Sequence, residues 1–407
     1  MSSLRQGYPR SSMNDKQEFD WRSITALNAV STLAQVGQYG IAFVVIPVWL
    51  AQQGLDARQL GVFAASLWLG QLPALAVAPR LCRRFGPRRV VAAGLLCTVV
   101  ALPLIALSEW PRWPLGGALA GAGLGLRWIG VEPWLYRIAP AHARGRLVGF
   151  HESLIALAPI VAPLLAGHFG LRDFSVFWAG AAFSMLALVP LAMARGADDI
   201  SSTARAALAS TNRLGTFGEL VFLRGVIIAL LSGMVYGALS GLFGLFTQGR
   251  GLSVAQTADL LALFGVGGLL LQYPVGWLAD HQGVGRAAIM CALGTAAAAL
   301  WLAWSMDYAI AMVAVFLLGG FITAFLTLAI VASTMTTGGN MARNVSVISM
   351  VYSGTGVVGP LIAGATMAAT RPGALMMLTA ILALSMAGAL AWTILRKPGR
   401  MVGTNVP

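Results

Sequence analysis

The stretch from Ile24 to Leu50 reads ITALNAVSTLAQVGQYGIAFVVIPVWL and decides the class of fold. It runs for 27 residues without a charged side chain. About 20 apolar residues suffice to cross the hydrocarbon core of a bilayer, and the apolar core of a signal peptide is shorter than this run. No small-residue cleavage site follows it. The sequence therefore predicts a helix that stays in the membrane.

Working outward from this run, the rest of the chain repeats the pattern. Of its 407 residues, 58% are apolar and only 10% are charged, whereas soluble chains carry about 25% charged residues. Twelve membrane helices need about 240 apolar residues, which accounts for nearly all of those present. We predict an all-α membrane protein with twelve transmembrane helices in two pseudo-symmetric six-helix bundles. The further runs are 59–79, 88–108, 114–138, 146–169, 174–194, 220–247, 255–279, 286–305, 309–335, 345–369 and 374–395.

A polar stretch from Arg195 to Glu219 divides the chain into six runs and six. The expected organisation is a tail (1–23), an N-terminal bundle (24–195), a linker (196–219), a C-terminal bundle (220–396) and a second tail (397–407). Of the 27 Lys and Arg residues, 21 fall on the side of the tails and five on the other, with Arg127 inside a run. Because basic loops stay in the cytoplasm, we predict an inner-membrane protein with both termini cytoplasmic.

The two halves resemble each other at an offset of 197 residues. At this offset Tyr39-Gly40 falls on Tyr236-Gly237 and Gly54-Leu55 on Gly251-Leu252. Leu81 and Gly86 fall on Leu278 and Gly283, and residues 163–167 (PLLAG) on residues 360–364 (PLIAG). Matches at one offset in equivalent places favour an internal duplication.

Short motifs between the runs resemble those of the major facilitator superfamily. The stretch Gly276-Trp-Leu-Ala-Asp280-His-Gln-Gly283, with Arg286 beyond it, is similar to the family's G-x-L-a-D-R-x-G-R-R signature. The resemblance implies that Asp280 and Arg286 hold neighbouring helix ends together and separate during alternating access. The first-half copy keeps the basic residues but has arginine where the family has aspartate. Its gating candidates are Arg83, Arg84 and Arg88.

Two further motifs bear on the branch of the family. Pro140-Ala-His-Ala-Arg144-Gly145 looks like the end of a sugar porter motif, which adds Arg144 to the gating candidates, but Arg137 replaces the motif's glutamate. The glycines and proline of 354–360 (GTGVVGP) resemble an antiporter motif, although that motif belongs to the fifth helix and these residues to the eleventh. Together they favour an efflux-like branch over the sugar porters.

Few charges fall well inside the runs, and they are the candidates for proton coupling: Arg127, Glu132 and Glu152, with His151 beside the last. A charge in mid-bilayer costs about 3 kcal/mol, so such groups face protein or a water-filled cavity. We expect the two glutamates to share a depth on neighbouring helices. The alternatives are a structural ion pair of Glu152 with Arg127 or Arg146, and packing of Glu132 on the face of Gly117, Gly121 and Gly125. Of Arg127 and Glu132, we expect the arginine to face the cavity.

A polar stripe on the first run provides the candidates for substrate binding. Asn28, Ser31, Gln35, Gln38 and Tyr39 share one helical face. In the resembled family the first, fourth, seventh and tenth helices line the cavity, so Gln35, Gln38 and Tyr39 are expected substrate contacts. Interhelical hydrogen bonding is the alternative. Further candidates are Trp128, Tyr236, Gln272 and Tyr352.

These observations predict a secondary active transporter that exports a small organic solute by proton antiport, as a monomer surrounded by membrane lipid. Uptake by proton symport or facilitated diffusion stays open, as does a non-transporting membrane sensor or scaffold. No phosphate-cradling Walker sequence, HExxH or serine-histidine arrangement occurs, so neither an enzyme nor a cofactor is expected. Three scattered cysteines and four scattered histidines suggest no metal, and the net charge of +13 is spread over short loops, which disfavours a nucleic-acid partner.

Overall fold

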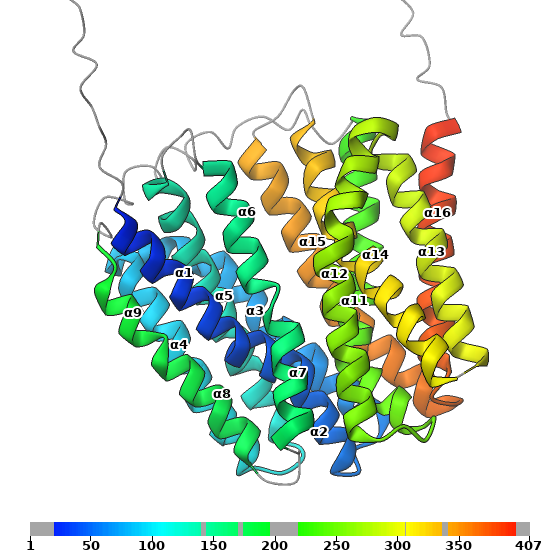
Figure 1. The fold of residues 1–407 in the computed structure, drawn as a ribbon, viewed down its shortest axis with the longest axis horizontal. Coiled ribbons are helices and arrows are strands. Elements are labelled where there is room, and N and C mark those ends of the chain that lie inside the picture. The colour runs from blue at the N-terminus through cyan, green and yellow to red at the C-terminus, as the bar shows by residue number, and fades with distance from the viewer. Residues whose placement is uncertain are drawn as a thin grey trace, which may run out of the picture.

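The computed structural model describes residues 20–139, 144–169, 174–195, 219–305, 307–335 and 341–395. Within these ranges the chain is helical and contains no strand. The helices form twelve crossings, and eleven of them meet the length and hydropathy expected of a membrane span. The twelfth is the 26-residue glycine-rich helix that carries Arg127 and Glu132. The predicted all-α membrane fold is confirmed (Figure 1).

The first half contains six crossings, some of them built from two or three segments. They are α1 (Trp21–Gln35) with η1 (Val36–Val45) and α2 (Ile46–Gln52), α3 (Ala57–Phe85), α4 (Pro87–Ala106), α5 (Trp113–Ile138), α6 (Arg144–Ile155) with α7 (Ala158–Phe169), and α8 (Ser175–Leu186) with α9 (Leu188–Met193). The second half contains α11 (Leu220–Gln248), α12 (Val254–Gln282), α13 (Val284–Trp304), α14 (Tyr308–Thr334), α15 (Met341–Ala369) and α16 (Ala374–Leu395). Most expected boundaries agree to within a few residues. The second helix extends six residues further than expected, because its basic end continues to Phe85.

Three crossings of the first half are interrupted, which periodicity did not predict. The first crossing turns into a π-helix over Val36–Val45, so that the Ile46 N–H donates to the Ile41 carbonyl five residues back. The fifth crossing breaks between Ile155 and Ala158, and the sixth at Ala187. π-helical segments are uncommon and occur often at functional sites.

The offset of 197 residues found in the sequence also relates the backbones of the two halves. Among the described residues four glycines have positive φ, and they form two pairs at this offset: Gly54 with Gly251 and Gly86 with Gly283. Asp56 and Ser253, again 197 residues apart, each open the following helix with a capping box. These turns need glycine because a side chain disfavours positive φ.

The two halves meet at one side of the membrane and part at the other. We call the side where α1 begins and α16 ends the terminal side, and the opposite one the far side (Figure 1). At the far side, a Cβ placed on Gly61 would lie 2.5 Å from the Pro360 carbonyl oxygen, and one on Gly265 2.7 Å from Ile160. The far-side part of the fifth crossing, α7, packs against α12.

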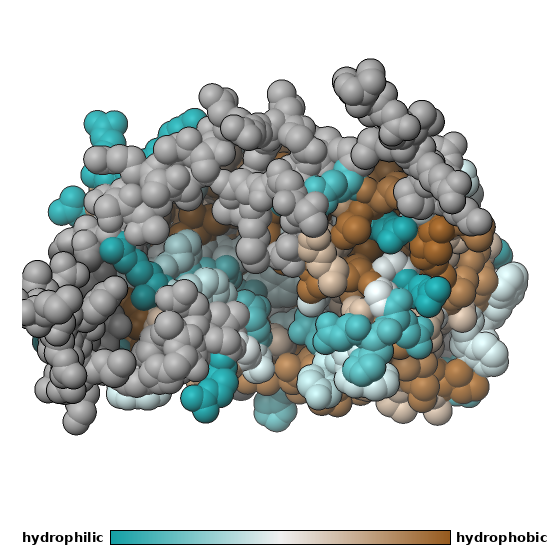
Figure 2. All heavy atoms as spheres, turned by 90° about the horizontal axis from the view of Figure 1, so that it is seen from above, coloured by the Kyte–Doolittle hydropathy of each residue, from teal (hydrophilic) through white to brown (hydrophobic). Residues whose placement is uncertain are grey.

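Towards the terminal side, a Cβ on Gly276, which lines a cavity between α12 and α14, would meet no neighbouring atom within 4 Å. Viewed from the terminal side, the molecule is hollowed between the halves (Figure 2). The cavity therefore opens to the terminal side and is closed at the far side.

Candidate functional site

Close approach of α4 and α5 buries the charged part of α5. A Cβ on Gly94 of α4 would lie 2.7 Å from the Gly123 carbonyl oxygen and 2.8 Å from the Arg127 nitrogen. Small residues let membrane helices approach in this way. Arg127 is consequently only 3% exposed, about halfway along its helix.

Two glutamines of the first crossing hold the Arg127 guanidinium. Its Nε donates to Oε1 of Gln38 at 2.8 Å, and its Nη2 donates to Oε1 of Gln35. The Gln38 amide in turn donates to Oγ1 of Thr98 at 2.9 Å and to the Gly94 carbonyl at 3.1 Å. Gln38 was expected to contact substrate, but its side chain is fully buried and forms its hydrogen bonds with other residues of the first half. Gln35 is half-buried, with Arg127 on one side.

Two carboxylates lie near Arg127 without forming an ion pair with it. Glu152 on α6 is exposed, and the Tyr136 hydroxyl donates to its Oε1 at 3.2 Å. Glu132 is half-buried and lies one helical turn beyond Trp128 on α5. Both carboxylates interact electrostatically with Arg127, and Glu132 also with Glu152. Sequence reasoning expected Arg127 to face the cavity, but Glu132 is the more exposed of the two because Arg127 turns towards α1.

His151 completes this group and is fully buried beside the first crossing. The Asn28 amide donates to the Ile24 carbonyl at 2.8 Å, so its Oδ1 is left to accept from Nδ1 of His151 at 3.0 Å. A neutral imidazole that donates through Nδ1 has an acceptor at Nε2. Within the described residues, Nε2 has no hydrogen-bond partner. His151 therefore has an unused proton-accepting nitrogen one residue from Glu152.

The remaining predicted substrate contacts include a cluster of aromatic rings where the halves meet. Tyr39 stacks on Phe43 with ring centroids 5.5 Å apart, and Tyr236 lies 6.2 Å from Tyr352. Both second-half tyrosines contact Trp68 of α3. Sequence reasoning missed Trp68, because a tryptophan inside an apolar run gives no signal that distinguishes it from lipid-facing residues.

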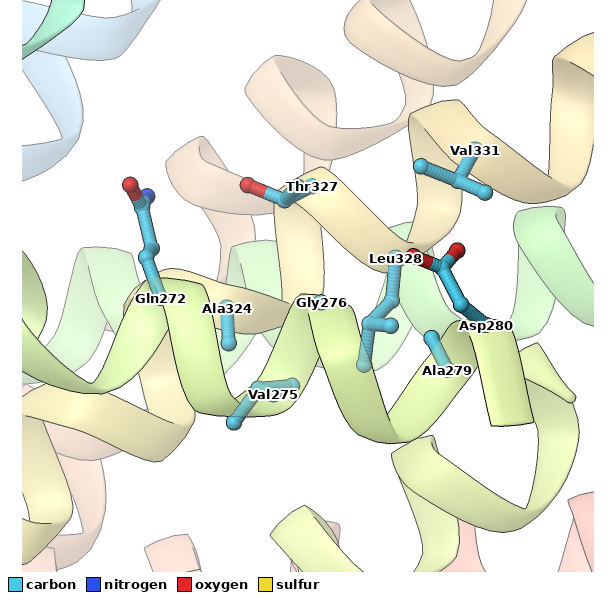
Figure 3. Close-up of a pocket in the computed structure, with 9 residues that line it drawn as sticks. All are labelled: Gln272, Val275, Gly276, Ala279, Asp280, Ala324, Thr327, Leu328 and Val331. Carbon is cyan, nitrogen blue, oxygen red and sulfur yellow. The ribbon is translucent and has the colours of Figure 1, made fainter. Parts of the chain in front are cut away.

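Gln272 lies apart from these residues, in a cavity of about 230 Å³ between α12 and α14. Figure 3 shows its amide and the Thr327 hydroxyl on the same side of α12, with Asp280 further along the helix. The C-terminal half thus lines its cavity with neutral groups except for this aspartate.

The gating candidates are distributed over both halves. Arg286 lines a different cavity, of about 310 Å³, from the one that holds Asp280, and the two side chains form no ion pair within 4 Å. In the first half, Arg84 lies over the Phe85 ring at 5.1 Å, and Arg83 is half-buried with an unpartnered Nη1. Arg88 donates to the Ala194 carbonyl and so joins α4 to the end of the sixth crossing. The side chain of Arg144 lies outside the described residues.

Comparisons with known proteins agree with the architecture. The Major Facilitator Superfamily profile matches residues 29–258 and 225–405. The chain belongs to the Major Facilitator Superfamily, which confirms the resemblance read from the motifs, and it is accordingly a multi-pass membrane protein.

Individual relatives are more distant. The chain is 28% identical over 251 residues to an uncharacterized MFS-type transporter, YcaD, of Escherichia coli O139:H28 (strain E24377A / ETEC). That match covers 58% of this chain and 62% of the relative. Among solved structures, the nucleoside transporter NupG has a TM-score of 0.73 at 13% identity, covering 92% of this chain and 99% of that one. A D-xylose-proton symporter has a TM-score of 0.71 at 16% identity, covering 90% and 97%. At such identities the likeness concerns the fold.

Proposed function

We propose that the protein exports a small organic solute across the inner membrane by alternating access, driven by proton antiport. The observation that carries this proposal is the group of two carboxylates, Glu132 and Glu152, beside the buried Arg127. Ionisable groups inside a membrane crossing are costly and mark ion pathways when they face a cavity. The far-side part of the fifth crossing, α7, packs against α12 of the second half, and Glu152 on the terminal-side part, α6, is exposed, so we place its carboxylate beside the opening.

Competition for Arg127 supplies a coupling mechanism. In this conformation Gln35 and Gln38 hold the guanidinium, and neither carboxylate comes within ion-pair distance of it. A protonated carboxyl leaves the two glutamines as the partners of Arg127. A deprotonated one attracts the guanidinium and competes with them, because it adds a full opposite charge where the glutamines offer only amide dipoles, and this attraction is stronger in a low-dielectric interior than in water. Proton binding and the position of α5 against η1 are thereby linked.

The surrounding residues would pass protons and contact substrate. Tyr136 orients Glu152, and Nε2 of His151 is a further acceptor. Gln35, Tyr39 and Trp128 on the first half and Tyr236, Gln272 and Tyr352 on the second are the proposed contacts for the solute. The polar chemistry lies in the N-terminal bundle (24–195), and the C-terminal bundle (220–396) offers a largely neutral wall.

The excess of Lys and Arg on the terminal side supports a cytoplasmic location for both termini. With this orientation the cavity opens to the cytoplasm, where an exported solute would enter. The alternative function, uptake by proton symport, would depend on protonation of the same carboxylates and would differ from export in the direction of net solute flux. We further propose that the transporter acts as a monomer in the lipid bilayer.

The test begins with a metabolite and growth screen that compares a deletion strain with an overexpressing strain. The compound that differs is then followed in everted membrane vesicles containing wild type, Glu152→Gln or Glu109→Gln. Glu109 is an exposed carboxylate between α4 and α5 and serves as the matched control. We expect a pH gradient to drive accumulation by wild type and by the control but not by Glu152→Gln. Unaltered, gradient-dependent accumulation by Glu152→Gln would show that this residue is not the coupling group.

A further inference from the structure

We propose that Trp68 is the gate residue that closes the far side of the cavity, by inserting from the first half into a seat on the second half. The seat consists of Gly356, Tyr236 and Tyr352. This inference rests on alternating access but not on proton coupling or on the identity of the solute.

The contacts of the indole cross the junction between the halves. Trp68 lies on α3, and its ring meets Tyr236 of α11 edge-on at 6.2 Å and Tyr352 of α15 edge-on at 5.9 Å. Edge-to-face pairs at these distances are attractive. On its own side, the indole meets Phe43 of η1 at 5.6 Å. The side chain is only 5% exposed.

Gly356 shapes the seat because it brings the α15 backbone against the indole. A Cβ placed there would lie 2.7 Å from Cδ2 of Trp68 and 2.9 Å from Cε3. Any larger residue would collide with the ring. The indole therefore fits the second half only while position 356 has no side chain.

Trp68 also lies at the depth where the halves begin to separate. Along α3 from the far side, Ala57 and Gly61 meet Gly364 and Pro360, Ala64 meets Gly241, and Trp68 meets Gly356. On the same face of α3 towards the terminal side, Leu72 and Leu75 are only half-buried, whereas Trp68 is buried. Trp68 thus forms the floor of the cavity, and the junction cannot open from the far side until its ring leaves the seat.

The closed gate carries one unsatisfied group, which would favour its opening. The indole Nε1 is buried and has no hydrogen-bond partner within the described residues. A buried donor without an acceptor is costly, and it regains one when water enters. The seat therefore combines attractive ring contacts with the energetic cost of an unpaired indole N–H. A closure that must reopen requires this balance.

Cysteine accessibility tests the gate without a known solute. The native Cys82, Cys97 and Cys291 are replaced by alanine, and one reporter is introduced per protein. Ala64→Cys reports on the far-side junction, where Ala64 is 1% exposed, and Gln272→Cys reports on the terminal-side cavity. Each reporter is combined with Trp68→Ala, Gly356→Ala or the control Leu69→Ala, whose side chain is 58% exposed. The probe is a membrane-impermeant maleimide applied to proteoliposomes and to detergent-solubilised protein.

We expect both seat variants to label several-fold faster at the far-side reporter and more slowly at Gln272→Cys, with Leu69→Ala at the wild-type rates. Trp68→Ala empties the seat, and Gly356→Ala expels an intact indole from it, so the two changes reach the same result by different routes. A far-side rate at the wild-type level in either variant, while the protein elutes as a monodisperse species, overturns the proposal. If Trp68→Ala does not elute as a monodisperse species, the labelling rate of Gly356→Ala alone tests the proposal. A failure of proton coupling would leave these rates unaffected, so the two proposals fail separately.

Discussion

The Arg127 guanidinium donates to the Gln38 side-chain oxygen at 2.8 Å, across 89 positions of sequence and between two membrane crossings. The only formal charge in this pair is thus met by a neutral amide, while two carboxylates stay beyond ion-pair distance. A buried arginine with neutral partners can exchange them at lower cost than one held in a buried ion pair, because breaking such a pair leaves an uncompensated charge. This arrangement suits a residue that changes partners during transport.

Removal of the Gln38 amide should destabilise this conformation. Gln38→Leu leaves the shape nearly unchanged but deletes a hydrogen bond to a charged group, which is worth about 2 kcal/mol. We expect a lower melting temperature in detergent, measured by intrinsic tryptophan fluorescence. Gln248→Leu, at the exposed end of α11, is the control and should melt like wild type. Equal melting of both variants would indicate that Arg127 does not depend on Gln38.

The α4–α5 contact should tolerate no side chain at Gly94. A Cβ there would lie 2.7 Å from one backbone oxygen and 2.8 Å from a backbone nitrogen, neither of which can move independently of its helix. Overpacking of this kind costs about 1–3 kcal/mol. We expect Gly94→Ala to lower the melting temperature and the yield of monodisperse protein. At Gly388 of α16, where a Cβ meets nothing within 4 Å, alanine should be neutral or slightly stabilising. The reverse order of the two variants would contradict the packing described above.

Asp20 should make stability depend on pH at the start of α1, outside the membrane crossing. Its Oδ1 accepts from the Ser23 backbone N–H at 3.0 Å, and hydrogen bonding with Ser23 lowers the pKa of this carboxyl below its usual value of 3.8. A lowered pKa in the folded state contributes stability above the unfolded pKa, and this contribution is lost as pH falls through the folded pKa. Wild type should therefore melt above Asp20→Ala at pH 6, and the difference should shrink below about pH 4. A difference that grows on acidification would refute this account.

Asp280 should matter for transport but not for the stability of this conformation. It is exposed and has no ion-pair partner among the described side chains, so Asp280→Asn should change the free energy of unfolding by no more than about 0.5 kcal/mol and leave the melting temperature close to that of wild type. The family resemblance implies that Asp280 and Arg286 hold neighbouring helix ends together and separate during alternating access, so we expect solute flux in vesicles to fall. Asp259→Asn, which alters an exposed far-side carboxylate that accepts from Tyr308, should keep its flux. Normal flux through Asp280→Asn would remove this residue from the gate.

Much of the architecture could be predicted because the bilayer imposes it. Every backbone polar group must be satisfied inside the hydrocarbon, so each long apolar run becomes a helix. The repeat could be read because duplicated turns need the same residues, as the positive φ of Gly54 and Gly251 shows. The charges inside the runs were visible for the same reason, since Arg127, Glu132 and Glu152 stand out against apolar neighbours.

The partners of those charges could not be predicted. Residue spacing gives the face of one helix, but which neighbour a face meets depends on how the helices pack. Gln38 lies on the expected polar stripe, yet the π-helical turn and the close approach of α4 direct it to Arg127 and Thr98 rather than to the cavity. Arg88, expected to act in gating, joins α4 to Ala194 within its own half.

The sequence by itself determined the membrane class, the twelve crossings, the duplication and the charged residues of the first half, because these depend on local hydrophobicity and on turn chemistry. Only the tertiary structure decided that Arg127 is held by glutamines, that the cavity opens to the terminal side, and that Trp68 occupies a seat beside Gly356. These features arise between residues far apart in the chain, where steric fit between helices rather than apolar pattern selects the contact.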